Sequence, residues 1–239
     1  MSTSIPKLRK KKKEPEITII DPEVVEMNLA RRSIYQFLTR IFSWEIDGVF
    51  LLRFKLPMVK SLLKDLGWKL ELDFKKKSDE EIVDELAIEY ARLFLGPAKH
   101  ISPHESVHNI REDGDYGKLW GQSTADVKKF IESAGLKFTE GFTGMPDHIA
   151  VELEFIRHIA DKECEAIEKG NFDDVLSCLK LAEQFISDHL LKWIESFTKQ
   201  VVEQAELPFY RSAAAATREV LLFDQKQLLE TIDKLYNRA

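Results

Sequence analysis

Long apolar runs are missing from this sequence of 239 residues. No uninterrupted apolar stretch is longer than four residues, whereas a membrane-spanning helix needs about 20. The apolar core of a secretory signal peptide, about 7–15 residues long, is missing for the same reason. We therefore expect a protein that is not membrane-embedded, carries no export signal and works in the cytoplasm.

Surplus positive charge and cysteine are also scarce. The formal net charge is −6, whereas general nucleic-acid binding needs surplus Lys and Arg to displace counterions from phosphates. The two cysteines, Cys164 and Cys178, lack CxxC spacing, so we expect ordinary buried thiols in a reducing compartment. This composition argues against nucleic acid as a partner.

One segment departs from this acidic balance. The stretch KLRKKKKE (residues 7–14) places six basic residues within seven positions. Because such a block repels itself, we expect residues 1–16 to form a disordered basic tail and residues 17–239 to form a helical domain. An RNA or membrane tether is the alternative function for this tail.

Helical periodicity dominates the rest of the chain, and strand-like alternation is nearly absent. The pattern predicts an all-α fold of about eight to ten helices. A first apolar stripe runs through Met27, Ala30, Ile34, Phe37 and Ile41. The longest stripe runs through Val175, Leu179, Ala182, Ile186, Leu190, Trp193, Phe197 and Val201. About two more helices are expected after Leu207-Pro208.

Helix boundaries are marked by capping and breaking residues. Ser78 and Glu81 form a capping box before the apolar face of a helix. Gly96-Pro97 ends that helix, because glycine tolerates the left-handed position after a helix and proline cannot continue it. A loop-rich region follows over residues 97–123. Thr124 is then expected to cap the next helix.

A further helix is expected to begin in the stretch GMPDHIAVELEFI (residues 144–156). Pro146 suits the first helical position and Asp147 complements the helix dipole. His148 should remain neutral there, because an imidazolium is disfavoured near a helix N-terminus, and it can then donate one hydrogen bond and accept another. An exposed acid beside a neutral imidazole suits recognition of a peptide.

Metal binding is the competing hypothesis. Glu105 and His108 have the Glu-x-x-His spacing of di-iron bundles, which also need a second such pair and two further glutamates. His148 and Glu152 share a helix face, so a helical metal-carboxylate enzyme using these four residues is the alternative function. We find no complete metal, nucleotide or catalytic motif, and we expect neither a cofactor nor enzymatic activity.

Five segments in order resemble the TorD/DmsD/NarJ family of redox-enzyme maturation chaperones. They cover most of the chain between residues 85 and 225: EYARLFLGP, SPHESVH, LWGQSTADVKKFIESAGL, MPDHIAVELEFI, and the pair DHLLKWIESF and ELPFYRSAA. The basic tail and His104, where the family more often has an aromatic residue, depart from the pattern.

The resemblance implies an all-helical, cytoplasmic chaperone that is not an enzyme. Such a chaperone binds the precursor of the catalytic subunit of a molybdopterin-dependent oxidoreductase, at its twin-arginine signal peptide or its mature part. It holds that precursor back from export until the molybdenum cofactor is inserted. The client could be a DMSO, TMAO, nitrate, selenate or other reductase. A monomer and a domain-swapped dimer both fit.

The resemblance also implies a peptide-binding site. Its residues are Pro146, Asp147 and His148 of the signature, with Tyr90, Phe94, Gly96, Pro97, Pro103, Glu105 and Ser106 of the other segments. We expect Asp147, Glu105 and Glu152 to face the guanidinium groups of a signal peptide. Tyr90 and Phe94 are expected to line an apolar groove, with core packing as the alternative.

Overall fold

The computed structural model describes residues 21–65, 67–68, 72, 75–96, 100–114 and 117–237. Every secondary-structure element assigned within these residues is a helix, so the all-α prediction is confirmed. The expected basic tail over residues 1–16 lies outside the described residues, and so does Pro97.

Ten α-helices and two π-helical segments are assigned in this part of the chain. They are α1 (Pro22–Ser43), α2 (Gly48–Arg53), α3 (Pro57–Asp65), α4 (Asp79–Tyr90), η1 (Ala91–Leu95), α5 (Glu105–His108), α6 (Gln122–Ser133), α7 (Ile149–Glu168), α8 (Phe172–Phe185), η2 (Ile186–Leu190), α9 (Leu191–Gln204) and α10 (Pro208–Tyr236).

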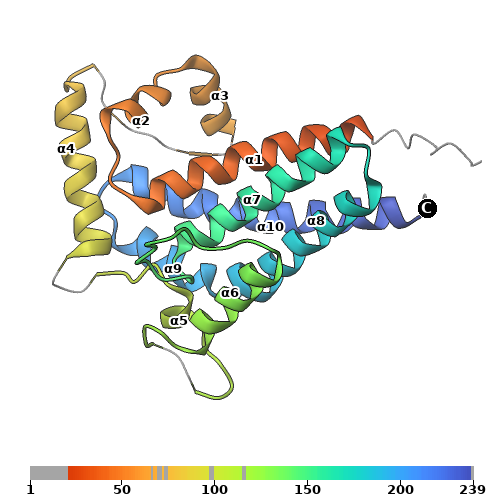
Figure 1. Cartoon of the computed structure of the whole chain (residues 1–239). Coiled ribbons are helices and arrows are strands. Elements are labelled where there is room, and N and C mark those ends of the chain that lie inside the picture. The colour runs from red at the N-terminus through yellow and green to blue at the C-terminus, as the bar shows by residue number, and fades with distance from the viewer. Residues whose placement is uncertain are drawn as a thin grey trace, which may run out of the picture.

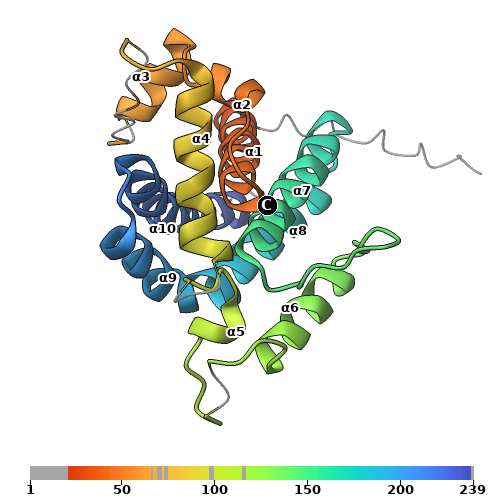
Figure 2. The same ribbon diagram turned by 90° about the vertical axis from the view of Figure 1, so that its left-hand side faces the viewer.

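The long helices α1, α7 and α10 run side by side and form the body of the molecule, with α8 against α7 and α10 (Figure 1). Helix α4 stands across one end of this bundle, and α5 and α6 lie below it (Figure 2). No helix in the described part of the chain is both long and apolar enough to cross a bilayer.

The long stripe between Val175 and Val201 is confirmed. All eight of its side chains are buried. The chain passes from α8 through the π-helical segment η2 into α9 without leaving the helix. The two helices expected after Pro208 are a single helix, α10, because neither glycine nor proline interrupts the alanine-rich run that follows.

The first helix is present, but its buried face was predicted about one residue out of register. Among the five residues of the predicted stripe only Ile41 is buried, and Ala30 is exposed. The buried face passes instead through Asn28, Arg31 and Tyr35. Polar residues can occupy this face because they have partners there: Arg31 pairs with Glu163 and Asp224 at 2.9 Å.

Several helix ends differ from expectation in detail. The capping box of Ser78 and Glu81 is confirmed in both of its hydrogen bonds. Gly96 ends η1 as expected, but with φ −63° and ψ 153° it is extended rather than left-handed. Helix α6 is capped at Gly121, and Thr124 is buried inside it.

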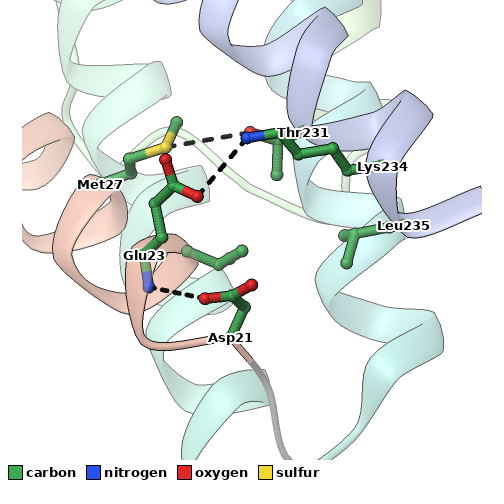
Figure 3. A pocket seen from close by; sticks show the side chains of 7 residues that line it. Asp21, Glu23, Met27, Thr231, Lys234 and Leu235 are labelled. Atoms are coloured by element: carbon green, nitrogen blue, oxygen red, sulfur yellow. Dashed lines mark hydrogen bonds and ion pairs between the residues drawn. The ribbon is translucent and has the colours of Figure 1, made fainter. Parts of the chain in front are cut away.

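The two ends of the described chain are joined where α1 begins and α10 finishes (Figure 3). The Asp21 carboxylate accepts a hydrogen bond from the Glu23 N–H at 3.1 Å. The Glu23 carboxylate then pairs with the Lys234 ammonium at 3.4 Å. The hollow between these helices is only about 10 Å³, so it serves packing rather than ligand binding.

Candidate functional site

Two loops far apart in the sequence meet edge to edge. The Glu105 N–H donates to the Asp147 carbonyl at 2.9 Å, and the Ile149 N–H donates to the Pro103 carbonyl at 2.8 Å. This pairing sets His104 opposite His148, with their rings 5.0 Å apart and nearly perpendicular. The structure therefore brings the SPHESVH and MPDHIAVELEFI segments together.

His148, rather than Asp147 or a preceding residue, caps α7. Its Nδ1 accepts the Ala150 N–H at 3.1 Å, so the prediction that Pro146 and Asp147 stand inside the helix is wrong. Burial, and then the neighbouring His104, lowers the pKa of His148 to about 4. The ring is thus neutral near pH 7, and because Nδ1 accepts, Nε2 carries the proton and can donate.

The three acidic residues near the paired loops are buried. Asp147 and Glu152 are 0% exposed and Glu105 is 1% exposed, so the expectation of an exposed acid beside the imidazole is wrong. The Asp147 carboxylate accepts the Ser106 N–H at 3.0 Å and holds the start of α5 in place.

Glu105 and Glu152 continue this buried network toward η2 and α9. The Glu105 carboxylate lies 3.0 Å from Nδ1 of His189 and accepts from the Asn109 amide at 3.1 Å. The Glu152 carboxyl accepts the Trp193 indole N–H at 3.1 Å. Burial, and then the charge of Glu105, raises the pKa of Glu152 well above its usual range. Glu152 therefore favours its neutral form.

His108 fastens the same loop to α9. Its Nε2 lies 2.6 Å from the Ser102 carbonyl and its Nδ1 lies 3.1 Å from the Ser196 hydroxyl. A carbonyl only accepts, so Nε2 carries the proton of the neutral ring. The ring also stacks on Trp193 with centroids 5.6 Å apart. Burial lowers the pKa of both His108 and His104.

These hydrogen-bond partners argue against the alternative that Glu105, His108, His148 and Glu152 bind a metal ion. Within the described residues no three His, Cys, Asp or Glu side chains are grouped so as to hold a metal ion. Glu105 and His108 instead bond to side chains and backbone of their surroundings, while Nδ1 of His148 is occupied by a backbone N–H.

The aromatic residues expected to line a groove lie in the core. Tyr90 is 4% exposed and Phe94 is 6% exposed, and the Tyr90 hydroxyl donates to the Phe42 carbonyl at 3.0 Å. The core-packing alternative therefore describes both residues. Pro103 and Pro146 are buried in the paired loops, and Ser106 is 3% exposed.

What remains accessible is a small surface that we call the histidine face: Ser102, His104, Met145 and His148, all partly exposed. The Ser102 hydroxyl lies 3.0 Å from Nδ1 of His104, and the Met145 carbonyl accepts the His148 N–H at 3.2 Å. Two neutral imidazoles thus lie at the surface above three buried carboxyl groups.

Two residues of the network, His189 and Trp193, were not assigned to the site from the sequence. Their spacing of four places both on one side of the helix, where one contacts Glu105 and the other Glu152. This spacing within DHLLKWIESF is the sequence signal from which both residues could have been assigned to the site.

Residues 57–199 match the model of the family described as nitrate reductase delta subunit. The chain is 26% identical over 217 residues to Chaperone protein TorD of Shewanella sp. (strain ANA-3), covering 85% of this chain and 96% of that protein. It is 25% identical over 228 residues to Chaperone protein TorD of Vibrio cholerae serotype O1, covering 91% and 98%.

Among solved structures, one described as a redox enzyme maturation protein from Archaeoglobus fulgidus matches with a TM-score of 0.48 and 21% identity. The match covers 80% of this chain and 93% of that one.

Proposed function

The chain belongs to the nitrate reductase delta subunit family, which includes the TorD and NarJ proteins, and from that premise we propose that it is a maturation chaperone for a redox enzyme. Its client is the precursor of a molybdopterin-dependent oxidoreductase subunit. The chaperone binds the twin-arginine signal peptide or the mature part of that precursor in the cytoplasm, before export. It acts by binding and not by catalysis.

The observation that carries this proposal is the histidine face. The loops that form it come from two of the segments that resemble the family, and the side chains beneath it come from a third. Residues separated by 84 and by 88 positions are thus held together by hydrogen bonds. Such convergence supports a binding site in this region.

The chemistry of the face suits an extended peptide. A neutral His148 with its proton on Nε2 can donate to a backbone carbonyl of the peptide. The acidic side chains of Asp147 and Glu105 below the face favour a negative potential there, and low dielectric around them strengthens that field. A cationic peptide is therefore attracted although the buried acids do not contact it.

The test is calorimetric titration of the full chain with twin-arginine signal peptides, each beside a version with Lys-Lys in place of Arg-Arg. We expect one peptide to bind selectively and its Lys-Lys version to bind more weakly, because only guanidinium groups make forked hydrogen bonds. Equal binding of both versions would contradict recognition of the twin arginines.

The variant His148→Asn links this binding to the histidine face. Asparagine caps a helix well, so α7 keeps its start while the imidazole donor is lost. We expect peptide affinity to fall about tenfold, the value of one hydrogen bond of about 1.4 kcal/mol. The matched control is His158→Asn, which removes an imidazole that is 45% exposed on the same helix. If both variants bind equally well, the peptide lies elsewhere.

A further inference from the structure

A concave surface lies between α1, α2 and α7, and none of the residues that line it belongs to the histidine face. It is a cleft of about 440 Å³, a volume in the range of ligand-binding sites. Arginines from three different helices line it: Arg40, Arg53 and Arg157. Nothing in the proposed peptide site uses any of them.

The charges of this cleft are only partly compensated. Arg40 pairs with Asp47 at 2.6 Å. Arg157 pairs with Glu154 at 2.6 Å and with Asp161 at 2.5 Å, and Asp161 also pairs with Arg32. Arg53 has no carboxylate partner within the part of the chain that the structure describes. These four arginines against three acids leave an excess of one positive charge, although the whole chain carries −6.

Arg40 and Arg53 both lie beside the ring of Phe50. The guanidinium of Arg40 lies 5.1 Å from the centre of the Phe50 ring, and that of Arg53 lies 5.6 Å from it. Each gains a cation–π contact, but two like charges beside one ring repel. A carboxylate bound to Arg53 would offset that repulsion and form charge-assisted hydrogen bonds with a guanidinium that has no acid partner.

Exposed apolar side chains continue the surface beyond the cleft. Val49 is 76% exposed and Leu52 is 53% exposed, three residues apart on α2 beside Arg53. Trp44 before this helix and Leu56 after it are 68% and 52% exposed. A small anion would leave these side chains in water, whereas a polypeptide segment covers charge and apolar surface together.

We propose that this surface, the cleft with the exposed face of α2, docks an acidic amphipathic segment of another polypeptide. Charge complementarity selects that occupant. The chain's own basic stretch, KLRKKKKE, carries the wrong sign. A second copy docking through the same face would bring arginines against arginines. A twin-arginine peptide is repelled for the same reason, so this surface is separate from the histidine face.

The test uses fluorescence anisotropy with the full chain and a labelled amphipathic peptide of glutamate and leucine. A second peptide carries lysine in place of each glutamate. We expect the glutamate peptide to bind and the lysine peptide not to bind, and binding to weaken as salt is added.

Arg53→Glu tests the cleft directly. Arg53 is exposed and has no acid partner, so the variant is expected to fold. We expect it to lower the affinity of the glutamate peptide by about tenfold or more, as loss of a charge-assisted contact does. Lys226→Glu is the matched control, because it makes the same charge change on a side chain that is 72% exposed on α10. Leu52→Ser is expected to weaken binding about threefold through the apolar part.

Three results would overturn the proposal: equal binding of the two peptides, equal effects of Arg53→Glu and Lys226→Glu, or a concentration-dependent dimer that Arg53→Glu dissociates. The last would make this face a contact between copies of the chain. None of these results depends on twin-arginine peptide binding, so this inference stands or fails separately from the proposed function.

Discussion

At the scale of single residues, the buried carboxyl pair of Glu105 and Glu152 determines how the site responds to pH. Below the ordinary pKa of a carboxyl group, about 4.3, Glu152 is protonated in both the folded and the unfolded chain. Above it the unfolded chain releases the proton, whereas folded Glu152 keeps it because its pKa is raised by burial and by Glu105. The contribution of this group to stability therefore falls as the pH rises between the two pKa values.

Replacing Glu152 by glutamine should remove this pH dependence. The glutamine carbonyl still accepts the Trp193 N–H, and no proton has to be retained. We expect Glu152→Gln to raise the free energy of unfolding at pH 8 by on the order of 1 kcal/mol, and to change it little at pH 4.5. Urea unfolding followed by circular dichroism at both pH values measures this.

Glu105→Gln serves as the contrast. Its carboxylate accepts from Asn109 and lies beside His189, so the amide disturbs bonds that Glu152→Gln leaves intact. A loss of about 2 kcal/mol is expected at pH 8. If instead Glu152→Gln destabilised the protein as much as Glu105→Gln, folded Glu152 would be ionised rather than neutral.

The burial of these acids was beyond the reach of local sequence patterns. Asp147 stands where an exposed acid at a helix start is common, but Ser106, its hydrogen-bond partner, lies 41 residues away. His148 was predicted to be neutral for a local reason, its place at a helix start, and burial acts in the same direction. The neutral state of His148 was thus predictable from its position in the sequence. The burial of Asp147 was not, because it depends on the distant loop that contains Ser106.

At the scale of helices, the end of α4 that faces the loop after α3 depends on one reciprocal cap. The Ser78 hydroxyl accepts the Glu81 N–H at 3.2 Å, and the Glu81 carboxylate accepts the Ser78 N–H at 2.7 Å. The same helix continues into η1, whose residues Leu93 and Phe94 enter the core. Fraying at Ser78 therefore loosens an element that ends in the aromatic core.

Ser78→Ala should lower the free energy of unfolding by about 1 kcal/mol, the usual cost of losing a serine cap. Thermal unfolding monitored by circular dichroism measures it. Ser61→Ala provides the comparison, because that serine is exposed within α3. Equal effects of the two substitutions would mean that the cap contributes nothing beyond helix propensity.

Helices were predictable where apolar residues alone define a face. The stripe from Val175 to Val201 has no polar interruption, and the structure buries all of it. In α1 the apolar stripe contained only one buried residue, Ile41, because Asn28 and Arg31 are buried by partners on α7 and α10. Such partners lie more than 130 positions away and leave no trace in the local pattern.

At the scale of the whole molecule, one buried arginine joins the three long helices. Arg31 of α1 donates to Glu163 of α7 and to Asp224 of α10, each at 2.9 Å. The Tyr35 hydroxyl donates to the same Asp224 carboxylate at 2.9 Å. Burial would disfavour the Arg31 charge, but the two carboxylates outweigh it and raise its pKa. The buried charges of Arg31, Glu163 and Asp224 therefore stabilise the bundle only when all three are present.

Removing the cation should therefore cost far more than removing a surface arginine. In Arg31→Met the carboxylates of Glu163 and Asp224 remain buried without their positive partner, and we expect the free energy of unfolding to fall by about 3–5 kcal/mol. Arg32→Met is the neighbouring control: its side chain is 49% exposed and pairs with Asp161, so a loss of less than about 1 kcal/mol is expected.

Adding Glu163→Gln and Asp224→Asn to Arg31→Met should then recover much of the lost stability, because no uncompensated charge is left in the bundle. Urea denaturation of the four proteins, wild type included, measures these differences. Equal losses from Arg31→Met and Arg32→Met would show that the bundle is held by its apolar contacts alone. Failure of the triple variant to recover would mean that hydrogen-bond geometry, and not charge balance, is what the cluster supplies.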